Sequence, residues 1–151
     1  MESKKQFAAI LRSIVCRKFK GQDIAPETQF LDIGDSLASV ELVLEVENVF
    51  HCYIPDEKLN VSTVGEFEEL VTKEMGEENI DKYIHVKDKI YEYIEPVFIN
   101  DDMSLNDAYR KEDLRLALQR EFGVTISKKD MIRVKKPYQL INMINHPISS
   151  E

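Results

Sequence analysis

The sequence has little of what marks several large classes of protein. Five glycines and five prolines among 151 residues are too few for a collagen-like chain or a disordered low-complexity one. No apolar run approaches the ~20 residues of a membrane helix, and residues 1–6 do not open a secretory signal. The two cysteines, Cys16 and Cys52, match neither a disulfide framework nor a metal-ligand spacing. We therefore expect a cytoplasmic protein without a membrane span.

Basic residues are in the minority, because 20 Lys and Arg residues face 28 Asp and Glu residues, for a formal net charge of −8. This balance argues against a general nucleic-acid-binding protein and predicts partners with basic surfaces. The excess of acidic residues is uneven. Residues 1–76 hold 14 acidic and 8 basic side chains, and residues 77–151 hold 14 acidic and 12 basic ones. We interpret the basic cluster at 128–136 as a solvated loop face, since no aromatic residues are interleaved with it.

Apolar residues recur at helical spacing along most of the chain. A long polar loop separates the first two periodic segments, and Asp35 is placed to cap the second. The predicted helices span residues 3–19, 35–50, 56–61, 64–75, 84–97, a long segment ending at 122, and 137–144. The sequence therefore predicts an all-α protein.

The second half of the chain repeats the pattern of the first. A shift of 72 residues superimposes four apolar positions of one half on the other, and a shift of 75 does so for two loop positions. The pairs are Leu42 and Leu114, Leu44 and Leu116, Phe50 and Phe122, Ile54 and Ile126, Ile24 and Ile99, and Phe30 and Leu105. With the polar stretch 76–79 as a linker, we expect two tandem bundles, residues 1–76 and 77–151, each with three long helices and one short helix.

The predicted helix at 36–50 has a second apolar stripe besides the one that its core requires. Its apolar members are Leu37, Val40 and Leu44, and the carboxylates beside them are Glu41, Glu45 and Glu47. This pattern fits a docking surface for a partner with a basic rim, and it fits equally a helix that is buried on most sides. A phosphate on Ser36, at the start of the helix, would meet free N–H groups and the positive end of the helix dipole. Most serines in that position only cap a helix.

The residues around Ser36 closely resemble those of acyl carrier proteins. The resemblance covers residues 3–75, and its motifs follow one another in the family's order. They are Asp32-Ile33-Gly34-Asp35-Ser36-Leu37, Val40-Glu41-Leu42, Ile54-Pro55-Asp56-Glu57 and Ser62-Thr63-Val64. The sequence departs from the family in one place, since Gly34 directly precedes Asp35 where the family usually has a residue between them.

The resemblance implies a role for each residue of the motif. Ser36 would receive 4′-phosphopantetheine from coenzyme A through a phosphopantetheinyl transferase, and Asp35 would help present it to that enzyme. The other partners implied are acyl-transferring and synthase enzymes with basic docking patches. The residues implied to face them are Leu37, Val40, Glu41, Leu44 and Glu47.

The implied function is that of a carrier and not of an enzyme. It would hold acyl intermediates as thioesters for fatty-acid or polyketide-type biosynthesis. The thioester would form on the arm's thiol and not on Cys16 or Cys52. Because Cys16 lies beside Val15 in the predicted helix 3–19, we expect it to be a small buried hydrophobic residue, and we expect the same of Cys52 in the connector. An aminoacyl or peptidyl carrier, and an adaptor in which Ser36 is never modified, stay open as alternatives.

The tetrapeptide 34–37 also spells the signature of the GDSL esterases, whose nucleophilic serine needs a histidine and an aspartate. Here it follows the polar loop 26–29 and not a buried strand. None of the histidines, His51, His85 and His146, has an aspartate three residues before it. We therefore reject the hydrolase interpretation.

Residues 80–146 resemble a degenerate carrier domain without the attachment serine. Ala108 occupies the position equivalent to Ser36 at one shift and Lys111 at the other, and Ser104 matches neither. The helix there is basic, through Arg110, Lys111, Arg115 and Arg120. We expect this half to dock a partner. Packing against the acidic first bundle, or simply stabilising it, stay open as alternatives.

Overall fold

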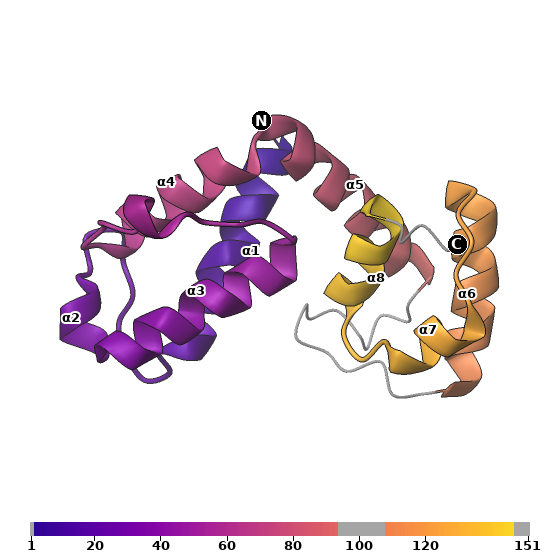
Figure 1. Ribbon diagram of the computed structural model, residues 1–151, viewed down its shortest axis with the longest axis horizontal. Coiled ribbons are helices and arrows are strands. Elements are labelled where there is room, and N and C mark those ends of the chain that lie inside the picture. Colours follow the sequence, from indigo (N-terminus) through magenta and orange to yellow (C-terminus); the bar gives the residue numbers. More distant parts are fainter. Residues whose placement is uncertain (1, 94–107, 147–151) are drawn as a thin grey trace. The chain divides into compact units, whose positions relative to one another are not determined.

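The computed structural model describes residues 2–93 and 108–146, and within these ranges it contains eight α-helices, one 3-10 turn and no strand (Figure 1). The helices are α1 (Glu2–Lys18), α2 (Phe30–Ile33), α3 (Ser36–Phe50), α4 (Val64–Met75), α5 (Glu77–Tyr93), α6 (Ala108–Phe122), α7 (Lys128–Arg133) and α8 (Pro137–Asn145), with the turn η1 (Asp56–Lys58) before α4. The prediction of an all-α protein is confirmed for these residues. The repeat positions Ile99 and Leu105 and the serine at 104 lie outside them. None of the described helices is long and apolar enough to cross a membrane.

The chain divides into two compact units, unit 1 (residues 1–81) and unit 2 (residues 82–151). In unit 1, α1 contacts both α3 and α4. The rings of Phe7 and Phe50 lie 4.6 Å apart between centroids and join α1 to α3. Phe30 and Phe67 meet edge to face at 5.7 Å and join α2 to α4. Because aromatic side chains bury large apolar areas, these two pairs form the centre of the unit 1 core.

The loop that precedes α2 is fixed to the start of α4 by backbone hydrogen bonds. Val64 N donates to Thr28 O at 2.9 Å, and Gly65 N donates to Pro26 O at 2.8 Å. A Cβ on residue 65 would lie 2.9 Å from Pro26 O, so only glycine permits this approach. In the other direction, Phe30 N donates to the carbonyl of residue 62 at 3.0 Å. These bonds fix the short helix α2, which the sequence pattern did not predict, immediately before α3.

The segment that we predicted to be a linker is mostly part of a helix. Gly76, at φ 83, ends α4, but α5 begins at the next residue, so the predicted linker 76–79 is mostly helical. Asn79 Nδ2 donates to Met75 O at 2.8 Å and satisfies a carbonyl at the end of α4. Ile80 is buried. The polar residues were therefore the exposed side of a helix that starts seven residues earlier than the predicted one.

Unit 2 has its own apolar core, formed by residues of α5, α6, α7 and α8 and of the connectors between them. Its buried members are Tyr83, Ile84, Val86, Ile90, Leu114, Leu118, Ile126, Met131, Val134, Leu140, Ile141 and Ile144. Arg115 on α6 donates to Ile126 O at 3.0 Å and pairs with Glu112 at 2.7 Å.

One hydrogen bond between a helix side chain and the connector that follows the helix recurs in both units. Glu47 Oε2 on α3 accepts from Ile54 N at 2.9 Å. At the same shift of 72 residues, Gln119 Oε1 on α6 accepts from Ile126 N at 2.8 Å. Both isoleucines are buried. Glu47 and Gln119 therefore occupy equivalent positions and bind equivalent residues of the following connector, but the acceptor is a carboxylate in unit 1 and an amide in unit 2.

The starts of α4 and α8 are also alike. Glu66 Oε1 accepts from the N–H groups of residues 62–63 at 2.8 and 3.1 Å. Gln139 Oε1 accepts from those of residues 135–136 at 2.6 and 2.9 Å. These bonds to Glu66 lower the pKa of its carboxyl, because they favour the ionised form. Again an amide replaces a carboxylate.

We predict that Glu68 contributes more to the stability of unit 1 than Glu74 does, although both lie on α4 and their side chains are 17% and 15% exposed. Glu68 accepts from Arg12 on α1 through both oxygens, at 2.6 and 2.7 Å, whereas Glu74 accepts from Lys58 Nζ through one oxygen, at 2.9 Å. Glu68→Gln should lower the free energy of unfolding by about 1–2 kcal/mol, and Glu74→Gln by about 0.5 kcal/mol. Urea unfolding followed by NMR signals of unit 1 measures both. Equal losses would contradict the prediction.

Candidate functional site

The N-terminal end of α3 places Ser36 at the surface. Asp35 is the N-cap residue, and its Oδ1 accepts from Ala38 N at 2.8 Å. Ser36 is the first residue of the helix and is exposed. The carboxylate of Asp35 therefore fixes the first turn of α3, so that the hydroxyl of the next residue is held at the open end of a helix.

Gly34 brings this turn close to the core. A Cβ on residue 34 would lie 2.6 Å from Cε1 of Phe19, a distance that real Cβ contacts do not show, and 3.4 Å from the Cβ of Ala38. Phe19 is 5% exposed, so its ring has little room to move. The backbone of Gly34 is extended, at φ −173, and any residue could adopt it. Glycine is needed here for space and not for its conformational freedom.

The second apolar stripe of α3 is exposed. Leu37, Val40 and Leu44 are 64%, 55% and 58% exposed, while the core is contacted by the opposite side of the helix. Of the two interpretations that the sequence left open, the fully buried helix is therefore wrong for this stripe. Leu31 on α2, before α3, and Tyr53, after α3, are also exposed, so exposed apolar side chains both precede and follow this stripe.

The three carboxylates along α3 are not equivalent. Glu41 lies 2.9 Å from Lys18 Nζ, and its side chain is still 52% exposed. Glu45 lies 3.8 Å from Arg17. Glu47 is turned to the connector, where it accepts from the backbone of residue 54. Glu41 is therefore the most accessible of the three, and Glu47 is occupied by a structural hydrogen bond.

An apolar cleft of about 700 Å³ opens beside Ser36. It is lined by core residues such as Phe30 and Phe67 and by other residues of α2, α3 and the connector that contains η1. Besides Ser36 the lining includes Phe30, Leu31, Ser39, Val40, Val43, Leu44, Glu47, Tyr53, Leu59, Val61 and Phe67. Val40 and Leu44 were predicted from the sequence as site residues, whereas Leu31, Tyr53 and Leu59 were not. Their only signal is an apolar residue in an otherwise polar, aperiodic segment.

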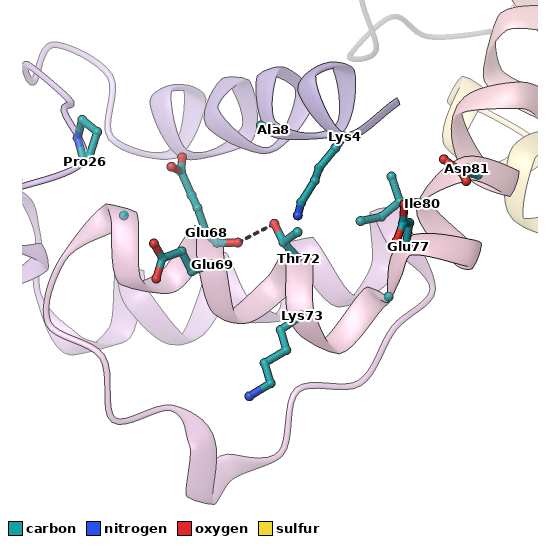
Figure 2. Close-up of a pocket in the computed structure, with 12 residues that line it drawn as sticks. Lys4, Ala8, Pro26, Glu68, Glu69, Thr72, Lys73, Glu77, Ile80 and Asp81 are labelled. Carbon is teal, nitrogen blue, oxygen red and sulfur yellow. Dashed lines mark hydrogen bonds between the residues drawn. The ribbon is translucent and has the colours of Figure 1, made fainter. Parts of the chain in front are cut away.

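A second groove, of about 640 Å³, lies elsewhere on unit 1, between α1, α4 and the first turn of α5 (Figure 2). Lys4 and Ala8 line it from α1, and Thr72 and Lys73 from α4. Figure 2 shows the hydroxyl of Thr72 bonded to the carbonyl of Glu68, at 2.7 Å. None of the predicted site residues lines this groove.

The two cysteines differ from each other. Cys16 is exposed, so the expectation of a buried residue is wrong: it lies outside the buried stripe that includes Ile14 and Val15. Cys52 is partly buried, and this burial, with the negative charges of Glu47 and Glu74, raises the pKa of its thiol to about 11. A thiol of that pKa is protonated and unreactive at neutral pH. Among the described residues no cluster of metal-ligating side chains occurs.

The basic residues of unit 2 do not all have the surroundings that the sequence pattern suggested. The side chains of Arg110 and Lys111 lie outside those described, and Arg115 is engaged with Glu112 and a backbone carbonyl. The cluster at 128–136 is not a loop, because six of its residues form α7. Ser127 caps this helix by accepting from Asp130 N at 3.0 Å.

We predict that Gly34→Ala destabilises unit 1 by about 1–3 kcal/mol, because the new methyl group overpacks against Phe19. In a Phe19→Leu background the same substitution should cost markedly less. A double-mutant cycle measured by urea unfolding isolates this coupling. An unchanged cost in the two backgrounds would show that the contact with Phe19 is not responsible.

We predict that Cys52 stays unreactive well above neutral pH. In the Cys16→Ser variant, the rate of alkylation by iodoacetamide should rise about tenfold per pH unit without levelling before about pH 10, because only the thiolate reacts. A plateau between about pH 8 and 9, as an ordinary cysteine gives, would contradict the raised pKa. Circular dichroism at each pH checks that the fold persists.

One family model matches the chain, over residues 9–71, and it describes a phosphopantetheine attachment site. The family binds 4′-phosphopantetheine covalently. No solved structure matches the chain. The matched residues run from α1 to α4 and include the whole of α3, so the resemblance to acyl carrier proteins is confirmed for this part of the chain. Residues 9–71 therefore match the phosphopantetheine attachment site family, and this match is consistent with an acyl carrier protein-type domain.

Proposed function

We propose that Ser36 is the residue to which 4′-phosphopantetheine is attached. One observation carries this assignment: Ser36 is an exposed hydroxyl at the first position of α3, inside the matched residues and beside the apolar cleft. A separate transferase would move the arm from coenzyme A to Ser36 Oγ. The new O–P bond would form as the pyrophosphate P–O bond of coenzyme A breaks, adenosine 3′,5′-bisphosphate would leave, and the hydroxyl proton would pass to a base of the transferase. Asp35 supports the transfer by fixing the first turn, and so the position of that oxygen.

The residues around Ser36 fit such an arm. Its phosphate would lie at the N-terminus of α3, where backbone N–H groups and the helix dipole favour negative charge. When bound, the arm supplies the thiol on which acyl groups are held as thioesters. This chain therefore needs no nucleophile of its own, in keeping with the protonated state of Cys52.

We further propose that the cargo is an acyl chain of the fatty-acid or polyketide type. The cleft beside Ser36 is lined mainly by aliphatic and aromatic side chains, including Val43, Leu59 and Phe67. Its volume of about 700 Å³ lies within the range of small-molecule sites, about 300–1,000 Å³. An apolar chain would lose contact with water there, whereas a charged aminoacyl group would gain nothing. This favours an acyl carrier over an aminoacyl or peptidyl carrier.

The exposed side of α3 supports a docking role towards enzymes with basic patches. Leu37, Val40 and Leu44 supply apolar area, and Glu41 supplies an accessible carboxylate. An apolar centre with a charged edge is the usual composition of a transient interface. Glu47 contributes less to such a surface than the sequence implied, because it is bound to the connector.

For unit 2 we propose a degenerate carrier bundle that docks a partner and is not modified. The bond of Gln119 to Ile126 N and the bonds of Gln139 at the start of α8 repeat those of Glu47 and Glu66 in unit 1. These matches support the proposal that the two units share the same bundle. Hydrogen bonds conserved in position while charge is lost are consistent with a unit that keeps the bundle but not the chemistry.

We predict that a phosphopantetheinyl transferase, supplied with coenzyme A, adds one phosphopantetheine mass to the chain. Intact-mass spectrometry should show complete loss of this addition in Ser36→Ala and normal addition in Ser39→Ala. Ser39 is the matched control, since it lies on the same helix and lines the same cleft.

Each alternative gives a different result. No addition to the wild-type chain, with circular dichroism showing it folded, would favour the adaptor in which Ser36 is unmodified. Addition to Ser36→Ala would move the attachment site to another residue. Peptide mapping of the loaded wild-type chain locates the modified serine directly.

A further inference from the structure

Charge of opposite sign is concentrated in two separate segments of the chain. Residues 21–57 contain nine carboxylates and no lysine or arginine, so they account for more than the whole formal net charge of −8. Residues 127–136 contain five basic side chains and one acidic one. The first segment contains α2 and α3, and the second contains α7.

The outer side of α7 combines basic residues with an exposed aliphatic one. Met131 and Val134 face the core of unit 2 and are each 2% exposed. Ile132 is 71% exposed, and Lys128, Lys129 and Arg133 beside it are exposed as well. Residues four apart lie on the same side of a helix, so these side chains form one surface, which we call the α7 face.

The repeat shows that this charge has been inverted. At the shift of 72 residues, Lys128 and Lys129 stand where η1 has Asp56 and Glu57. Both elements follow the connector that is held by the equivalent hydrogen bonds to Ile54 and Ile126. The same place in the two units therefore carries acid in one and base in the other.

The protein itself contains a surface with the complementary composition. The exposed side of α3 presents Leu37, Val40 and Leu44 with Glu41 beside them, in the segment that lacks any lysine or arginine. We call it the α3 face. The pairing of Glu41 with Lys18 does not close it, because that carboxylate is half exposed and exposed pairs contribute little.

We propose that the α7 face binds the α3 face of a second copy of this chain. Ile132 would meet the apolar stripe, and Lys128, Lys129 and Arg133 would meet the carboxylates around it. Each copy offers both faces, so two such contacts in one pair would reinforce each other. The inference rests on the docking role proposed for unit 2, but it does not depend on modification of Ser36.

The test is sedimentation velocity of the full, unmodified chain over a range of concentrations. At low salt, about 20 mM, the chain should self-associate reversibly, and at about 0.5 M salt the dissociation constant should rise about tenfold or more, since salt screens the charges. Lys128→Glu with Lys129→Glu should abolish association at low salt. Ile132→Asp should do the same through the apolar centre.

Matched controls separate the α7 face from net charge and from exposed apolar area in general. Lys4→Glu with Lys5→Glu changes the net charge equally at two exposed positions of α1 and should leave association unchanged. Leu116→Asp introduces the same charge at an exposed leucine of α6 and should also have no effect. A monomer at every concentration, or equal loss in control and α7 variants, would overturn the proposal.

Mixing two variants identifies the partner surface. The Lys128→Glu, Lys129→Glu chain keeps its α3 face, and a Leu37→Asp, Val40→Asp chain keeps its α7 face. Neither should self-associate, but their mixture should form a heterodimer through the one remaining contact. A mixture that stays monomeric would exclude this pairing but not the attachment at Ser36, which is tested separately by the mass of the loaded wild-type chain.

Discussion

The position of Ser36 depends on the backbone hydrogen bonds that join the loop before α2 to the start of α4. These bonds, from residues 64 and 65 to the carbonyls of Thr28 and Pro26, fix a segment with little regular structure of its own. Gly34 then lies against Phe19, and Asp35 starts α3. The end of α3 that carries Ser36 is thus fixed from both sides, by α4 through the loop and by the core through Gly34.

The sequence predicted the helices of unit 1 well, because the apolar periodicity of α1, α3 and α4 is that of their buried sides. The predictions failed for residues whose place in the structure depends on which side of a helix is exposed, because apolar periodicity does not reveal this. Residues 76–79 look like a linker because they are polar, yet they belong to the exposed side of a helix. Cys16 lies next to a buried valine but on the outer side of α1. Periodicity also carries no signal for the four-residue helix α2.

The candidate site was predictable as a motif and not as a shape. Ser36 and Asp35 could be identified from their order in the sequence, but the exposure of Leu37, Val40 and Leu44 required the fold. The cleft is built partly by Tyr53 and Leu59, which follow α3 and come near it only because the connector is fixed by Glu47. Glu47, which the sequence assigns to a partner surface, therefore also shapes the candidate site through its bond to the connector.

The replacement of Glu66 by Gln139 at equivalent helix starts has a consequence for acid tolerance. Glu66 holds the start of α4 only while it is ionised, and the lowered pKa of its carboxyl keeps this contribution until the pH falls below the usual carboxyl range. The amide of Gln139 does not titrate, so the start of α8 is held equally at any pH. On acidification, therefore, the start of the helix that anchors the Ser36 loop loses the charge of Glu66 and keeps the cap formed by the Thr63 hydroxyl, whereas its counterpart in unit 2 keeps its bonds to Gln139 unchanged.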